Sequence, residues 1–129
     1  MAKRISPTAN ETKLERKVRL IINNHIINYD NRQQFFEDLQ NGGCQSGIIG
    51  ELIYYSDTLA FYNKYKQEIN TLLYDTMKNI GTNNPVDVFD AKWDKEDPLA
   101  LETTNHNLLA WFGFEETAFN IAREIGIEI

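Results

Sequence analysis

The stretch INTLLYDTMKNIG, residues 69–81, has the clearest helical pattern in this sequence of 129 residues. Apolar side chains recur there at steps of three and four, at Ile69, Leu72, Leu73, Met77 and Ile80. This period places them on one face of a helix, and Gly81 follows where a helix commonly ends on a left-handed residue. The segment therefore predicts an amphipathic helix whose apolar face needs a covering surface.

Segments with the same period lie on both sides of this stretch. Further helices are expected over residues 10–28, 30–41, 46–55, 58–65, 85–89 and 104–125. The first begins behind Thr8 and Glu11, which have the spacing of a capping box. Almost no segment alternates with the period of two that a half-buried strand requires, although the tail at 127–129 is open to one short strand or to fraying. The sequence therefore predicts an all-α fold of about six helices, orthogonal or bundle-like, as a single domain over 10–129 behind a flexible N-terminus at 1–9.

Composition narrows the class of protein. The formal net charge of -6 argues against general binding to a phosphate backbone, which requires a clustered positive field. A single Cys excludes an internal disulfide and a Cys-only zinc site, and it favours the reducing cytoplasm. The N-terminus has no signal-peptide core, and no apolar run reaches the roughly 18 residues of a membrane span. We therefore expect neither secretion nor membrane insertion.

Charge and aromatic side chains are unevenly distributed. The first 40 residues have a net charge of +2, whereas region 87–102 carries six acidic and two basic residues. Adjacent aromatic pairs such as Phe61-Tyr62 diverge by about 100° on a helix, so some rings should reach the surface. Acidic groups beside exposed rings are typical of a protein interface. The residues expected to bind a partner are Asp87, Asp90, Trp93, Asp94, Glu96, Asp97, Tyr62 and Tyr65. A solvated acidic surface and an aromatic-rich core are the alternatives left open.

Signals for catalysis and for metal binding are weaker. Cys44 precedes an expected helix start and could act as a nucleophile with His25 or His106 as its base, which leaves a Cys-dependent hydrolase or transferase as an alternative. The glycines around Cys44 lack the ending of a P-loop, and His106 with Glu102 forms no complete metal-ligand pattern. We therefore predict no catalytic residue, metal or cofactor.

The basic first helix supports a third function. Its cations are Lys13, Arg16, Lys17 and Arg19. Such a row is typical of a regulator that binds nucleic acid through phosphate contacts, with an affinity that falls steeply as salt rises.

Two longer segments resemble a family of small uncharacterised proteins carried by phages, plasmids and conjugative elements of Gram-positive bacteria. They are CQSGIIGELIYYSDTLAFYNKYKQEIN, residues 44–70, and KWDKEDPLALETTNHNLLAWFGFEETA, residues 92–118. The resemblance covers about 30–127 and leaves 1–29 outside. It brings no catalytic residues, but it implies an intracellular protein of a mobile element.

The leading hypothesis is therefore a non-enzymatic accessory protein that binds a host or element-encoded protein. By analogy with other small acidic proteins of mobile elements, the partner would be a nucleic-acid-processing effector. Inhibition of a nuclease-based defence, of the anti-CRISPR or anti-restriction type, would follow from carboxylates that mimic nucleic-acid charge. Whether the aromatic surface closes a homodimer is left open by the sequence.

Overall fold

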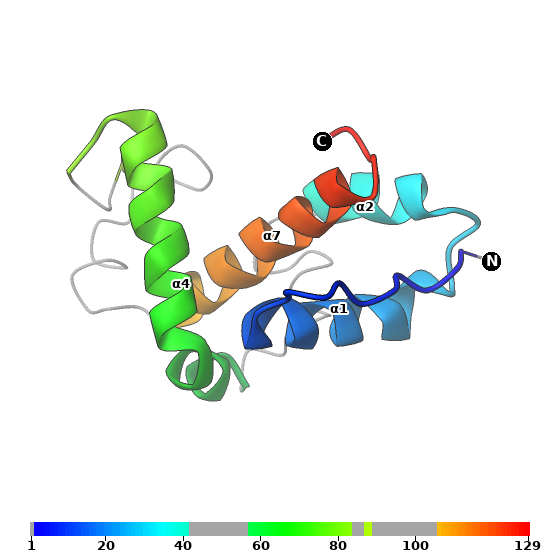
Figure 1. Ribbon diagram of the computed structural model, residues 1–129, viewed down its shortest axis with the longest axis horizontal. Coiled ribbons are helices and arrows are strands. Elements are labelled where there is room, and N and C mark those ends of the chain that lie inside the picture. The colour runs from blue at the N-terminus through cyan, green and yellow to red at the C-terminus, as the bar shows by residue number, and fades with distance from the viewer. Residues whose placement is uncertain (1, 42–56, 84–86, 89–105) are drawn as a thin grey trace. The chain divides into compact units, whose positions relative to one another are not determined.

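The computed structural model describes residues 2–41, 57–83, 87–88 and 106–129. Four helices lie in these ranges: α1 (Lys13–Ile26), α2 (Arg32–Asn41), α4 (Thr58–Ile80) and α7 (His106–Glu124) (Figure 1). No strand occurs among the described residues, which confirms the all-α prediction. The predicted helix at 46–55 lies outside them, and of the one at 85–89 only residues 87 and 88 are described, both helical.

The chain divides into two compact units. One contains Met1–Tyr54 and Phe114–Ile129, and the other contains Tyr55–Gly113. We call them unit 1 and unit 2. Helix α7 contributes its first residues, through Gly113, to unit 2 and the rest to unit 1. The single domain expected over 10–129 stays a prediction.

Helix α1 begins later than the sequence suggested. The hydroxyl of Thr12 accepts a hydrogen bond from the backbone N–H of Glu15 at 3.1 Å, so Thr12 is the N-cap. The predicted cap at Thr8 is wrong, because Thr12 and Glu15 repeat the same spacing four residues later. The buried stripe consists of Leu14, Val18, Ile22 and Ile26, each at most 1% exposed. A 14-residue helix is marginal on its own, so this stripe supplies most of its stability through packing.

Helix α2 follows the prediction closely. The side chain of Asn31 accepts a hydrogen bond from the backbone N–H of Gln34 at 2.8 Å, which caps the first turn. Phe35, Phe36 and Leu39 are fully buried in unit 1. The ring of Phe35 meets those of Tyr29 and Phe36 edge-on, at centroid distances of 5.1 and 5.2 Å. These aromatic contacts fix the turn between α1 and α2 against the core.

Residues 2–5, which we call the N-terminal arm, lie beside α1 and run in the opposite direction (Figure 1). The backbone of Ile5 bonds to the side chain of Asn23, and the N–H of Ala2 donates to the carbonyl of Tyr29 at 2.6 Å. Ala2 and Ile5 are both buried. These contacts hold the arm against unit 1, and the expectation that residues 1–9 are flexible stays a prediction.

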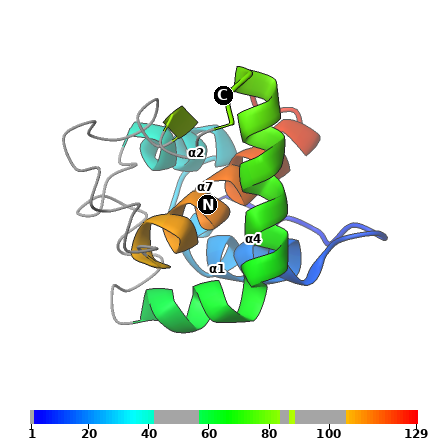
Figure 2. The ribbon, with the colours of Figure 1, turned by 90° about the vertical axis from the view of Figure 1, so that its left-hand side faces the viewer.

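Helix α4 joins the two helices predicted at 58–65 and 69–80 into one. Tyr65 has non-helical backbone angles, φ -114° and ψ 22°, and the helix bends there (Figure 2). The first predicted helix ends at this bend, so the pattern located the irregularity but not the continuity across it. At the other end Gly81 adopts φ 87°, and its N–H and that of Thr82 both bond to the carbonyl of Met77. This confirms the predicted glycine stop.

Helix α7 buries nearly all its described side chains from Leu109 to Ala122. Among them, Gly113 allows close packing in unit 2, because a Cβ built there would lie 2.5 Å from Cγ1 of Ile69. The helix ends at Glu124, followed by Gly126 with φ 86°, as the sequence predicted. The tail at 127–129 forms no strand, and the N–H of Ile127 instead bonds to the carbonyl of Ala122. None of the helices in the described ranges is both long and apolar enough to cross a bilayer.

Candidate functional site

The predicted partner-binding residues fall into three groups. Asp87 is described and exposed, whereas Tyr62 and Tyr65 are described and buried. The other five lie outside the described residues, and they are Asp90, Trp93, Asp94, Glu96 and Asp97. The part of the candidate surface that the structure describes therefore consists of α4 and the segment that leads from it to Asp87.

Tyr62 and Tyr65 belong to the core of unit 2, which corrects the expectation that they anchor a partner. Each is 5% exposed. The rings of Phe61 and Tyr65 pack at a centroid distance of 5.1 Å, and the Tyr62 hydroxyl lies 3.5 Å from the side-chain oxygen of Asn70. Both members of the Phe61-Tyr62 pair are buried, at 7% and 5% exposure. The alternative of an aromatic-rich core holds for these rings.

Exposed apolar side chains do occur on α4, at positions that the sequence pattern did not single out as binding residues. Tyr74 is 68% exposed, and Leu59 and Ile80 are each 50% exposed. The outward row around Tyr74 also contains Thr71 and Lys78, one turn before and after it, both exposed. A tyrosine beside polar neighbours on a helix surface has the composition of an interface anchor. Its exposure was readable from the sequence, since Tyr74 lies off the Leu73–Met77 stripe.

The end of α4 brings apolar and acidic groups together. Ile80 occupies the last position of the helix, and Gly81 turns the chain immediately after it. The hydroxyl of Thr82 then donates a hydrogen bond to the carboxylate of Asp87. This bond fixes the first acidic residue of region 87–102 close to the exposed end of the helix.

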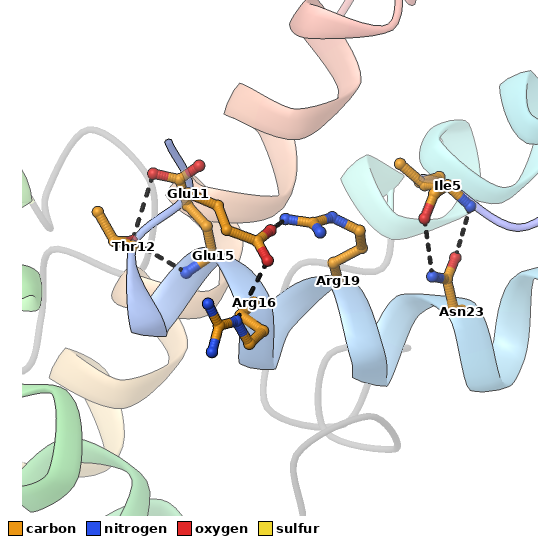
Figure 3. Close-up of polar contacts among 7 residues, drawn as sticks. All are labelled: Ile5, Glu11, Thr12, Glu15, Arg16, Arg19 and Asn23. Carbon is orange, nitrogen blue, oxygen red and sulfur yellow. Dashed lines mark hydrogen bonds and ion pairs between the residues drawn. The ribbon is translucent and has the colours of Figure 1, made fainter. Parts of the chain in front are cut away.

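The basic residues of α1 separate into a buried and an exposed set. Arg19 is buried and forms an ion pair with Glu11, whose side chain is 7% exposed (Figure 3). Burial lowers the pKa of the Arg19 guanidinium below its usual value, and the charge of Glu124 opposes this shift. Arg16 reaches the same carboxylate at 3.2 Å from the solvent side, with its side chain 72% exposed.

Arg19 is therefore a structural residue, and its predicted place in a nucleic-acid-binding row is wrong. It lies on the edge of the apolar stripe, where the helix faces Glu11. Lys13, Arg16 and Lys17 remain exposed on the outer side of the helix. A charged residue next to a buried stripe is ambiguous from the sequence, because the period does not reveal an ion-pair partner that precedes the helix.

The described residues provide no geometry for catalysis by Cys44 or for metal binding. Cys44 lies outside the described residues, and so does the side chain of His106, although its backbone begins α7. His25 lies in the last turn of α1 and is partly exposed. No group of three or more His, Cys, Asp or Glu side chains within the described ranges is placed to hold a metal ion. The Cys-dependent alternative stays a prediction.

Two polar side chains, Asn23 and Arg32, were not identified as functional from the sequence. Both bond to the backbone of the N-terminal arm. The available signal was the apolar pair Ala2 and Ile5 in an otherwise polar segment, which indicated that the arm packs against the domain.

Comparisons with known proteins place the domain in a family. Curated proteins and solved structures give no match. The chain does match a family described as "Domain of unknown function (DUF7222)" over residues 11–127. This range contains all four described helices, so the basic helix α1 is part of the family domain, whereas the resemblance noted from the sequence begins near residue 30. Since the match spans nearly the whole chain, the protein belongs to the DUF7222 family.

Proposed function

We propose that this protein binds another protein, without catalysing a reaction, through the acidic region 87–102 and the exposed side chains of α4. One observation carries the proposal. Among the residues that the structure describes, four large hydrophobic side chains are exposed; Leu59, Tyr74 and Ile80 lie on α4, and only Leu20 lies elsewhere. Scattered single exposures are normal, but three on the helix that leads directly into an acidic region favour a binding role.

The chemistry of this surface suits a positively charged partner. Region 87–102 carries a net charge of -4, and its first acid, Asp87, is held by Thr82 near Ile80. Carboxylates accelerate encounter with a basic surface, while a tyrosine supplies contact area at a small entropic cost. The partner would therefore offer an apolar pocket bordered by Lys or Arg.

The narrower form of the proposal names the partner's class. The resemblance to proteins of phages, plasmids and conjugative elements supports a cytoplasmic setting in which host defence nucleases are present. Such nucleases have positive surfaces for nucleic acid, and an acidic protein can occupy them. We propose inhibition of a nuclease of this kind, with the acidic region in the place of nucleic acid.

Charge reversal tests the acidic region. The variant Asp94→Lys/Glu96→Lys/Asp97→Lys should weaken capture of the partner by roughly tenfold or more, because both steering and contact depend on these charges. The matched control makes the same change in charge at three exposed acids of unit 1, Asp30, Asp38 and Glu128, and it should retain capture. An equal loss of capture in both variants would show that the net charge of the protein, and not the position of the acids in region 87–102, determines binding. Undiminished capture by the first variant would contradict the proposal.

Apolar substitutions test α4 separately. Tyr74→Asp places a charge at a ring that is 68% exposed and should weaken capture by about 1 to 3 kcal/mol, the range for an interface anchor. Leu20→Asp on α1 is the control, since its side chain is 55% exposed and outside α4. Circular dichroism confirms that both variants fold. An effect of Leu20→Asp as large as that of Tyr74→Asp would contradict the assignment to α4.

A second candidate is nucleic-acid binding by α1, favoured by the exposure of Lys13, Arg16 and Lys17 on one side of the helix. Three phosphate contacts predict that the logarithm of affinity falls with the logarithm of salt concentration with a slope of about -2 to -3. Lys13→Glu/Lys17→Glu should remove binding to duplex DNA. Absent or salt-insensitive binding by the unmodified protein would exclude this candidate.

A further inference from the structure

The hydrogen bonds that Asn23, Tyr29 and Arg32 form with the N-terminal arm all involve the backbone of the arm. The side-chain amide of Asn23 accepts a hydrogen bond from the N–H of Ile5 at 2.8 Å and donates one to the carbonyl of Ile5 at 3.0 Å (Figure 3). The guanidinium of Arg32 donates to the carbonyls of Lys3, at 3.0 Å, and of Arg4. The N–H of Ala2 also donates a hydrogen bond to the carbonyl of Tyr29. These hydrogen bonds recognise the backbone of an extended segment and do not depend on the identity of its side chains.

Side-chain recognition is confined to two positions. Ala2 and Ile5 are 7% and 4% exposed, whereas Lys3 and Arg4 between them are exposed. A ligand of this surface therefore needs a small side chain followed three residues later by a β-branched aliphatic one. Burial of the Ile5 side chain removes more apolar surface from water than burial of the Ala2 methyl group, so this position dominates selectivity.

The family match includes the residues that hold the arm but not the arm itself. Asn23, Tyr29 and Arg32 lie within the range that matches the family, whereas the arm lies before residue 11, where the match begins. Residues 6–10, which connect the arm to the domain, are all exposed. The recognising residues thus belong to the family domain, while the segment they hold is an attachment on an exposed linker.

We propose that Asn23, Tyr29 and Arg32 form a binding site for an extended segment of a partner protein, and that the N-terminal arm occupies this site in its own chain. The segment recognised has a small residue and a β-branched aliphatic residue at i and i+3. Extended peptides are commonly bound through main-chain hydrogen bonds with pockets for selected side chains. The site lies in unit 1 and does not depend on the function proposed for α4 and region 87–102.

The arm acts as an internal competitor in this arrangement. A short flexible linker gives a tethered segment an effective concentration in the millimolar range. A partner segment therefore binds the unmodified protein weakly unless further contacts assist it, and weakening of the arm exposes the full affinity of the site. This coupling makes the proposal testable in the full-length protein.

The experiment uses the variant Ile5→Asp, whose arm cannot bury its fifth residue. The probe is a fluorescent peptide with the sequence of residues 2–8, acetylated so that the amide of its first residue is retained. Fluorescence anisotropy should show binding to Ile5→Asp that is at least about tenfold tighter than binding to the unmodified protein. The double variant Ile5→Asp/Asn23→Ala should lose this binding.

Two altered probes test what is recognised. Replacing the Lys and Arg of the peptide by Ser should leave its affinity within about threefold, because those side chains are exposed in the arm. Replacing its Ile by Asp should abolish binding. Absence of binding to folded Ile5→Asp, or binding that persists in the double variant, would overturn the proposal.

Two measurements on the unmodified protein complete the test. Hydrogen exchange at the amide of Ile5 should proceed through local release of the arm, faster than at Ile22 in the core of α1, and this result remains available if Ile5→Asp does not fold. Exchange only by global unfolding would overturn the proposal. Analytical sedimentation tests whether a second copy of the chain supplies the segment that fills the site. If the unmodified protein is a dimer and Ile5→Asp is a monomer, the arm of a second copy fills the site, and the assignment to a partner protein is overturned.

Discussion

The ion pair between Glu11 and Arg19 gives the sharpest prediction about stability. Both side chains are nearly inaccessible, at 7% and 6% exposure, so water cannot replace a lost partner. Glu11→Gln preserves the shape of the side chain but removes its charge. The guanidinium of Arg19 then keeps the attraction of the Glu124 carboxylate, together with one amide oxygen that can accept a hydrogen bond.

The expected magnitude follows from this geometry. Removing one partner of a buried ion pair costs about 3 to 5 kcal/mol, and the residual contacts favour the lower end, near 3 kcal/mol. A loss of this size corresponds to a decrease of roughly 10 °C in Tm for a domain of this length. Arg19→Met should cost less, about 1 to 2 kcal/mol, because Glu11 keeps its contact with Arg16 and Met preserves most of the apolar packing of the stem.

Urea unfolding followed by circular dichroism measures these free energies. In the Arg19→Met background, Glu11→Gln should have little further effect, so the double-mutant cycle should yield a coupling of about 3 kcal/mol, close to the whole cost of Glu11→Gln in the unmodified protein. Arg16→Met is the control and should change the unfolding free energy by under about 1 kcal/mol, since its ion pair is solvated on one side. Additive losses in the cycle, or a stability of Glu11→Gln within about 0.5 kcal/mol of the unmodified protein, would refute the role of the pair.

Three backbone and packing predictions complement this one. Gly113→Ala should destabilise the protein by about 1 to 3 kcal/mol, because its Cβ would overlap Cγ1 of Ile69, and Ile69→Ala in the same chain should relieve the overlap in a thermal-unfolding cycle. Gly81→Ala should cost about 1 to 2 kcal/mol through its left-handed backbone alone, as nothing lies near its Cβ; an unchanged urea midpoint would contradict this. Thr12→Ala should lower the free energy of unfolding by about 1 kcal/mol, whereas Thr8→Ala should change it by less than about 0.5 kcal/mol. The reverse order would indicate that Thr8 and not Thr12 caps the helix.

The candidate surfaces were only partly readable from the sequence. Acidic composition identified region 87–102, and Asp87 is exposed as a surface acid should be. Periodicity could not assign Tyr62 and Tyr65 correctly, because the burial of a ring on a helix depends on which segments pack against it, and both rings are buried. The contacts of the proposed peptide-binding site had a different limit: Ala2 and Ile5 signalled an apolar arm, but Asn23 bonds to a residue 18 positions away, and no local pattern encodes that pairing.

The amino-acid sequence by itself determined the helical class and the ends of several helices, since caps and stops depend on residues within one turn. The glycine stops at 81 and 126 are of this kind. The tertiary structure alone decided that Arg19 is buried against Glu11 and that the N-terminal arm is docked. Periodicity defines which face of a helix is covered, but the identity of the covering segment depends on contacts between residues distant in the chain.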